Sequence, residues 1–191
     1  MLRIGLDLDG VAYEWGSVAR FLLSHHFGYI LEKEASHWWA YRDAVKKEHW
    51  RWLWDEGVRN HGLFRHGHLY KGTVEALENL RHLGRIIVIT ARPETARQDT
   101  LDWLAFHQLP VSEFHLLAGE SAKSSVRPFC DLYVDDSPGV VQDLSENTPG
   151  VVLCWDRPWN QSLVADGNVR RVSSWLEVIN EARRLKILEA A

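Results

Sequence analysis

The stretch LRIGLDLDGV, residues 2–11, opens the chain with an apolar run that ends in two acids. We expect residues 2–8 to form a buried strand, because a short apolar run is typical of a strand inside a sheet. Alternate side chains of a strand point the same way, so Asp7 and Asp9 can face one cleft at its carboxyl end. Gly10 allows the sharp turn that follows. Taken alone, the motif is explained equally well by an Asx-turn.

A second strand is predicted at residues 85–90, RIIVIT, which are mostly β-branched. It ends in Thr90, which is followed by the small Ala91 and then by Arg92. A hydroxyl and exposed backbone N–H groups at a strand-to-helix junction are suited to binding a phosphate. The competing interpretation is that Thr90 caps a helix, and Arg92 can either reach the phosphate or cap that helix.

A third apolar strand, residues 131–134, ends in the paired acids Asp135 and Asp136. Lys123 precedes this strand by a short segment. Each of these residues also has an ordinary structural explanation. The acids can cap a helix that begins near Pro138, and Lys123 taken singly is better explained as a solvated surface charge.

The combination of the three motifs favours a binding site. In open α/β sheets the ligand site lies outside the carboxyl ends of the strands, where all these polar groups are expected. Two close carboxylates repel each other unless a proton or a cation lies between them. An acid pair with a third acid offers the hard oxygen ligands that Mg²⁺ prefers. The hydroxyl and the ammonium can then hold a phosphate beside the metal.

Strands and helices alternate from residue 72 onward, which is typical of a parallel sheet with helices on both faces. Further strands are expected at residues 114–117 and 151–155, and helices at residues 72–83, 94–107, 137–145 and 173–188. The first helix should end at Gly84, a C-cap, and bury Val74, Leu77, Leu80 and Leu83. The last helix should begin at Ser173 or Ser174, with its apolar residues at Trp175, Leu176, Ile179 and Leu185.

A long segment, residues 15–70, separates the first strand from the rest of the predicted sheet, and a single crossover helix needs far fewer residues. We therefore expect an α/β core from residues 1–14 and 71–191 with a small, mainly helical insert. The insert holds six of the ten tryptophans, and most of them are expected to fill its core. Trp15, Trp38 and Trp39 are the candidates to face the cleft and stack on a nucleobase.

The overall composition is that of an ordinary globular domain of 191 residues. The formal net charge of −4 argues against a protein that coats nucleic acid. No apolar run approaches the roughly 18 residues that cross a bilayer, and no signal peptide is expected. Because the only cysteines are Cys130 and Cys154, a disulfide framework is excluded and a reducing compartment, the cytoplasm, is expected.

As an ordered set, the motifs resemble those of the haloacid dehalogenase superfamily of phosphohydrolases. DLDGV at residues 7–11 resembles the first motif of that superfamily, Thr90 the second, Lys123 the third, and the pair Asp135 and Asp136 the fourth. The resemblance implies a Rossmann-like parallel sheet flanked by helices, with a cap inserted after the first strand. Within the superfamily the chain is most similar to the 5'(3')-deoxyribonucleotidases and related phage and bacterial proteins, which share the D-x-D-G-V motif and a helical cap of this size.

The resemblance also implies a role for each residue. Asp7 would attack phosphorus, and Asp9 would protonate the leaving alkoxide and then activate water. Mg²⁺ would be held by Asp7, by the backbone carbonyl of Asp9 and by Asp135, with Asp136 as an alternative ligand or a neighbour of the ligands. The residues that would hold the phosphate are Thr90, Ala91, Lys123 and, if it does not cap the helix, Arg92.

Three hypotheses of function follow. The leading one is a Mg²⁺-dependent phosphomonoesterase that acts on a nucleoside (deoxy)monophosphate. The second is a phosphatase for another small phosphate ester or for a nucleic-acid 3'-phosphate end. The third is a non-catalytic binding or regulatory protein, which the intact acidic residues disfavour. Neither a membrane nor a long nucleic acid is an expected partner, and the sequence leaves the oligomeric state open, a homodimer included.

Overall fold

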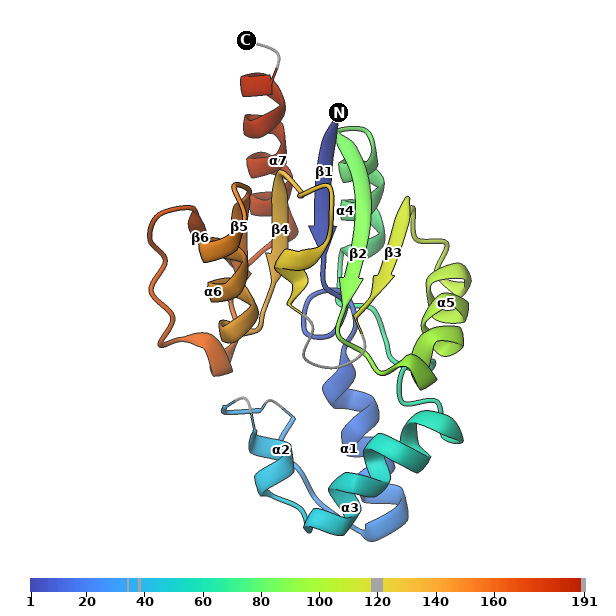
Figure 1. Cartoon of the computed structure of the whole chain (residues 1–191). Coiled ribbons are helices and arrows are strands. Elements are labelled where there is room, and N and C mark those ends of the chain that lie inside the picture. The colour runs from blue at the N-terminus through green and yellow to red at the C-terminus, as the bar shows by residue number, and fades with distance from the viewer. Residues whose placement is uncertain (34, 38, 118–121, 190–191) are drawn as a thin grey trace.

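The computed structural model describes residues 1–33, 35–37, 39–117 and 122–189. Its strands form one six-stranded parallel sheet with the order β3-β2-β1-β4-β5-β6 (Figure 1). This architecture confirms the predicted fold class, an α/β protein with a Rossmann-like sheet. The strands are β1 (Leu2–Leu6), β2 (Gly84–Thr90), β3 (Glu113–Leu116), β4 (Leu132–Asp135), β5 (Val151–Trp155) and β6 (Val169–Val172).

Side chains of the central strands alternate between two hydrophobic layers, one on each face of the sheet. In β2, Ile86 and Val88 belong to the larger layer, and Ile87 and Ile89 belong to the smaller one. Strands buried on both faces contain nearly continuous apolar residues, which explains why the RIIVIT stretch lacks a polar alternation. The sheet is therefore held between two cores, and only its edges and strand ends are free to carry polar groups.

Helices cover both faces of this sheet. Helices α4 and α7 pack against each other and against β1 and β2, and α6 packs against β4 and β5 from the other face. The helices after the insert are α4 (Thr73–Arg81), α5 (Arg97–Phe106), α6 (Pro138–Asn147) and α7 (Trp175–Glu189). Short 3-10 turns occupy Glu94–Ala96, Lys123–Ser125 and Pro158–Asn160.

The prediction that Gly84 caps the preceding helix is wrong, because Gly84 is the first residue of β2. His82 is the C-cap of α4. A Cβ atom at Gly84 would lie 2.4 Å from the carbonyl oxygen of Leu2, the residue paired with Gly84 on β1. Glycine is therefore needed here because the two backbones approach closely. The sequence alone does not distinguish a glycine that ends a helix from one that begins a strand.

The buried faces of α4 and α7 differ from the expected ones by one position each. Val74 and Leu176 are exposed, whereas Ala76 and Val178 are buried. In α4, residues repeated at a step of three drift around the axis, because this step covers less than one turn of an α-helix. In α7, Leu176 directly follows Trp175 and so lies about 100° around the axis from that buried residue. Ser174 is the N-cap, because its hydroxyl accepts a hydrogen bond from the backbone N–H of Glu177, and the carboxylate of Glu177 accepts one from the backbone N–H of Ser174.

The sixth strand, β6, was not predicted. Its sequence, VRRV, has neither a continuous apolar run nor a strict alternation. It pairs with β5 at the edge of the sheet, where one side of the strand is exposed. Edge strands of this length carry a weak sequence signal because only their ends contribute to the core.

The segment between β1 and α4 is helical and lies beyond the carboxyl ends of the strands (Figure 1). It contains α1 (Trp15–Phe27), α2 (Ala40–Asp43), α3 (Lys47–Trp52) and the π-helix Leu53–Gly57. The tryptophans at alternate positions 50, 52 and 54 thus lie on helical turns, as the surrounding polarity indicated. None of the described helices has the length and apolarity needed to span a bilayer.

Two glycine substitutions test the close approach of β1 and β2. Gly84→Ala should lower the free energy of unfolding by about 1–3 kcal/mol, because its methyl group meets the backbone of Leu2. Gly139→Ala is the matched control, since a Cβ there meets nothing within 4 Å inside α6. It should raise the free energy of unfolding by about 0.5–1 kcal/mol. Urea denaturation measures both, and equal effects would contradict the packing described at Gly84.

Candidate active site

The carboxyl ends of β1, β2 and β4 bring the predicted polar residues together. Leu6 on β1 pairs with Val88 on β2 and with Val134 on β4, so the residues that follow lie at the same edge of the sheet. Asp7 follows β1, Thr90 ends β2, and Asp135 ends β4. The sequence motifs, which are more than forty residues apart along the chain, thus form one group at the edge that faces the helical insert.

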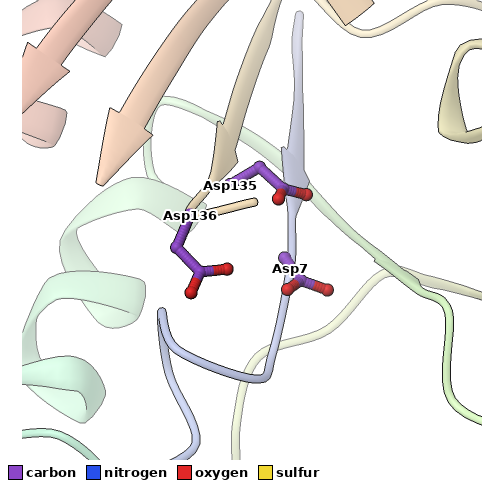
Figure 2. A group of neighbouring side chains, drawn as sticks. All are labelled: Asp7, Asp135 and Asp136. Atoms are coloured by element: carbon purple, nitrogen blue, oxygen red, sulfur yellow. The ribbon is translucent and has the colours of Figure 1, made fainter. Parts of the chain in front are cut away.

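Three acids form a compact group at this edge. An oxygen from each of Asp7, Asp135 and Asp136 lies within 4.8 Å of the oxygens from the other two. Figure 2 shows that Asp7 reaches this place from β1 and the other two from the end of β4. All three residues are buried. Buried carboxylates at this separation repel one another strongly, so the group is suited to binding a cation.

Lys123 supplies one positive charge to the acidic group. Its Nζ lies 2.6 Å from Oδ1 of Asp7 and 2.7 Å from Oδ2 of Asp135. The side chain is buried, so the interpretation of Lys123 as a solvated surface charge is wrong. A buried ammonium is stable only when it is paired, and here it bridges two of the three carboxylates.

The pKa values of this group are shifted by burial and by neighbouring charges. Burial raises the pKa of Asp7 above its ordinary value, although Lys123 opposes the rise. Burial also raises the pKa of Asp136 well above its ordinary value, and repulsion by Asp135 and Asp7 adds to that rise. Burial lowers the pKa of the Lys123 ammonium, but attraction by Asp135 and Asp7 outweighs it, so the pKa is raised overall. One ammonium therefore does not compensate three buried carboxyl groups.

A loop after β5 holds Asp136 in place. The indole Nε1 of Trp159 donates to Oδ2 of Asp136 at 3.0 Å, and the side-chain amide of Asn160 donates to the backbone carbonyl of Asp136 at 2.9 Å. Gly10 approaches the same carboxylate so closely that a Cβ would lie 2.0 Å from Oδ2, and it has a φ of 81°. Only glycine satisfies both conditions.

Arg157, in the same loop, contacts the turn after β1. Its Nε donates to the carbonyl of Gly10 at 2.7 Å, and its guanidinium lies over the ring of Tyr70, 4.1 Å from the centroid. The sequence analysis missed Arg157, Trp159 and Asn160. The signal was present, because these residues directly follow the predicted strand at residues 151–155, and the loops after parallel strands surround the ligand site.

Asp9 faces a different partner from the other acids. Its carboxylate receives two hydrogen bonds from Arg92, from Nε at 2.9 Å and from Nη2 at 2.8 Å. Its side chain is not part of the compact group that Asp7, Asp135 and Asp136 form. The side chain of Asp9 is 29% exposed, against 10% for Asp7, so Asp9 is the more accessible acid of the D-x-D pair, and Arg92 holds both of its oxygens.

Thr90 and Ala91 lie where the sequence places a phosphate site. Thr90 is buried, its hydroxyl accepts a hydrogen bond from the backbone N–H of Arg92 at 3.3 Å, and both Thr90 and Ala91 line the cavity above the acids. Lys123 lines the same cavity. A hydroxyl, a backbone N–H and an ammonium thus surround the space beside Asp7, which is an arrangement able to bind an anion.

A cavity of about 620 Å³ extends from these polar residues to the helical insert. Its far wall is aromatic and includes Trp15, Trp39, Trp50 and Trp54. The ring of Trp15 stacks against that of Trp54 at a centroid distance of 5.9 Å. Trp39 and Trp54 remain 46% and 41% exposed, so their rings are not core residues. This volume is within the range of about 300–1,000 Å³ for small-molecule sites.

Two of the three tryptophans predicted to face the cleft line this cavity. Trp15 and Trp39 both line the cavity, and Trp38 lies outside the described residues. Trp52 packs against the core, as expected for most of the tryptophans, whereas Trp54 was missed as a cavity residue. A periodic sequence pattern shows which residues share a face of a helix. It does not show which face packs against the core and which faces the cavity.

The donor set of the acidic group fits Mg²⁺. Its ligand atoms are carboxylate oxygens, with no sulfur or imidazole among the three grouped side chains. Hard oxygen ligands select Mg²⁺ or Ca²⁺ over the softer metals. The excess of buried negative charge over the single ammonium of Lys123 requires an additional cation or protons.

The fold and this edge of the sheet together define a protein of the haloacid dehalogenase class. The chain is similar in structure to a haloacid dehalogenase-like family hydrolase, SP0104 from Streptococcus pneumoniae, with a TM-score of 0.67, 13% identity and coverage of 95% of this chain and 98% of that one. It is also similar to L-2-haloacid dehalogenase from Xanthobacter autotrophicus, with a TM-score of 0.66, 12% identity and coverage of 96% and 99%. Identities this low establish the fold alone.

The sequence comparisons identify the family within that class. Residues 1–187 match the family described as "5' nucleotidase, deoxy (Pyrimidine), cytosolic type C protein", and the chain belongs to this family. A relative named "Putative nucleotidase YqfW" from Bacillus subtilis is 24% identical over 190 residues, which cover 94% of this chain and 92% of the relative. The chain is therefore a phosphatase of the haloacid dehalogenase type, from a family of nucleotidases.

The excess negative charge leads to a prediction for Asp136. In the absence of metal, Asp136→Asn should raise the melting temperature by about 2–4 °C, or about 1 kcal/mol for a chain of this length. The amide removes a buried carboxyl group whose raised pKa destabilises the fold, whether the group is charged or protonated, and it leaves both ion pairs of Lys123 intact. The same variant should be stabilised less by Mg²⁺ than the unmodified protein. Differential scanning fluorimetry with and without Mg²⁺ measures both effects.

Asp166→Asn is the matched control, since Asp166 is exposed and far along the chain from the acidic group. It should change neither the melting temperature nor the response to Mg²⁺. A fall in the metal-free melting temperature of Asp136→Asn would contradict the repulsion described here.

Proposed function

We propose that this protein is a Mg²⁺-dependent phosphomonoesterase that hydrolyses a nucleoside (deoxy)monophosphate through an aspartyl-phosphate on Asp7. The observation that carries the proposal is the arrangement of Asp7 at the strand edge. It lies between an acidic group able to hold a metal and an anion-binding set of Thr90, Ala91 and Lys123. A phosphoryl group bound there would be in contact with the Asp7 carboxylate.

Asp7 is the proposed nucleophile. Lys123 fixes the carboxylate through Oδ1, which orients the group and offsets its charge as a dianionic phosphate approaches. An oxygen of Asp7 forms a bond to phosphorus while the bond from phosphorus to the ester oxygen breaks. Thr90 and the backbone N–H of Ala91 hold the phosphoryl oxygens through this step.

Asp9 is the proposed acid and base. It donates a proton to the leaving ester oxygen in the first half of the reaction. In the second half it takes a proton from the water that attacks the aspartyl-phosphate, and Asp7 is released with inorganic phosphate. One carboxyl group cannot be nucleophile and acid at once, so two acids in different surroundings are required.

The residues proposed to hold Mg²⁺ are the side chains of Asp7, Asp135 and Asp136 and the backbone carbonyl of Asp9. When bound, the metal neutralises charge that develops on the phosphoryl oxygens. Lys123 already occupies one oxygen of Asp135, and Trp159 donates to one oxygen of Asp136. The backbone N–H of Ser137 also donates to Oδ1 of Asp135 at 3.0 Å. These hydrogen bonds fix the orientation of both carboxylates of the β4 pair.

Residues 15–70 are the proposed cap, and the aromatic wall is the proposed site for the base. Aromatic rings stack on a nucleobase with about 1–3 kcal/mol per base. We expect a small-molecule phosphate ester as the partner and the cytoplasm as the location.

A panel of phosphate esters tests the reaction. With Mg²⁺, the protein should release phosphate from at least one deoxynucleoside monophosphate, and Asp7→Asn should abolish the release, because the amide cannot attack phosphorus. Chelation of the metal should have the same effect. Release only from sugar phosphates would exclude a nucleotidase, and no release from any ester would favour a binding protein.

Alanine substitutions test the aromatic wall. Trp39→Ala and Trp54→Ala should raise KM for a deoxynucleoside monophosphate by about 5- to 100-fold, the equivalent of one stacked base, with a smaller effect on the melting temperature. Phe106→Ala is the control, since this exposed ring at the end of α5 does not line the cavity. A loss of stability with unchanged KM in both tryptophan variants would instead assign these rings to packing.

A further inference from the structure

We propose that Arg92 is a positioning residue that holds the carboxylate of Asp9, and that it is not a ligand of the phosphate. This inference rests on the proposed function, in which Asp9 is the acid and base. Arg92 binds both oxygens of Asp9 in a bidentate ion pair, with distances of 2.9 and 2.8 Å. Its own side chain is 1% exposed, against 29% for Asp9, so the ion pair is anchored on the arginine side.

The guanidinium of Arg92 is fixed on every side. Its Nη1 donates to the hydroxyl of Thr100 at 3.1 Å and to the carbonyl of Phe64 at 3.5 Å. The planar group lies 4.4 Å from the ring centroid of Tyr13 and 4.5 Å from that of Phe64. Contacts with these two rings and the hydrogen bonds together restrict the guanidinium and thereby fix the direction of its donors.

This arrangement leaves little capacity to bind a phosphate. Each of the three guanidinium nitrogens of Arg92 donates to a protein acceptor: Nε and Nη2 to Asp9, and Nη1 to Thr100 and Phe64. These bonds use four of the five N–H donors of the guanidinium, and only the second N–H of Nη2 is left. A bidentate contact with a phosphate would therefore require breaking one of these buried bonds, which is costly. The backbone N–H of Arg92 donates to the hydroxyl of Thr90. The backbone N–H after β2 that we assign to anion binding is therefore that of Ala91.

The same contacts connect Asp9 to the segment that leaves the helical insert. The hydroxyl of Tyr13 donates to the carbonyl of Leu63 at 2.6 Å and accepts from the backbone N–H of Gly67 at 2.7 Å. Phe64 lies between these two points and contributes both a ring and a carbonyl to Arg92. The orientation of Asp9 therefore depends on how residues 63–67 are seated against Tyr13.

Positioning of the acid has a specific kinetic consequence. A proton from Asp9 is needed when the ester oxygen is a poor leaving group, as in an alkyl phosphate, but not when it leaves as a stable anion. Loss of Arg92 should therefore slow phosphoryl transfer from alkyl esters selectively. A phosphate ligand would behave differently, because its loss weakens the binding of every ester and of inorganic phosphate alike.

The experiment compares thymidine 5'-monophosphate with p-nitrophenyl phosphate, whose nitrophenolate leaves without a proton. For Arg92→Met, kcat/KM should fall by about 100- to 1,000-fold with the nucleotide and by less than about 5-fold with the nitrophenyl ester. The inhibition constant of inorganic phosphate should not change. Arg65→Gln is the control, because Arg65 forms its ion pairs with Asp99 and Asp102 at the surface.

A double-mutant cycle asks whether Arg92 acts through Asp9. In an Asp9→Asn background, Arg92→Met should cost no further activity with the nucleotide, because residues that act as a unit are not additive. Thr100→Val covers the case in which Arg92→Met does not fold. It removes the hydroxyl that holds Nη1 while keeping a similar shape, and it should lower kcat/KM for the nucleotide alone, by about 3- to 30-fold.

The outcomes separate this inference from the proposed function. Equal losses with both esters, together with weaker inhibition by phosphate, would overturn the positioning role and assign Arg92 to phosphate binding. Additive losses in the Asp9→Asn background would overturn it as well. If the unmodified protein hydrolyses neither ester, the proposed function fails, and the role of Arg92 in it fails too.

Discussion

The crowding of three buried carboxyl groups around one ammonium is the constraint on which the rest of this structure depends. Asp7, Asp135 and Asp136 are brought within 4.8 Å of one another, and Lys123 pairs with two of them. Such a group is unfavourable without a further positive charge, since burial and mutual repulsion act in the same direction. The surrounding structure holds it in place: two cores fix the strands, and the loop after β5 fixes the last acid through Trp159 and Asn160.

Two parts of the chain surround this group, the ends of the sheet strands and the helical insert. The polar groups stand at the ends of strands that are packed on both faces, which keeps their positions accurate. The aromatic wall comes from the helical insert, where Trp39 and Trp54 are partly exposed. Arg92 joins the two parts, because it binds Asp9 on one side and Phe64 on the other. The chemistry and the choice of substrate thus reside in different elements and meet at one ion pair.

Most of the sheet could be predicted because parallel strands buried on both faces have an unmistakable apolar sequence. The exceptions have physical reasons. Gly84 was assigned to a helix end, since glycine serves equally at a C-cap and where two backbones approach closely. The edge strand β6 was missed because it contributes only its terminal valines to the core. In the candidate site, Thr90 and the acids were anticipated, whereas Arg157 and Trp159 were not, although they follow a predicted strand.

The sequence alone determined that acids, a hydroxyl and a lysine would meet at one edge of a sheet. This follows from local rules: apolar runs form strands, and parallel strands end together. Only the tertiary structure decided that Lys123 is buried, that Arg92 binds Asp9, which is 83 residues away along the chain, and that Trp54 faces the cavity. These properties depend on which distant segments pack against each side chain. No local pattern encodes them, because the same residue is a surface charge or an ion-pair partner according to what covers it.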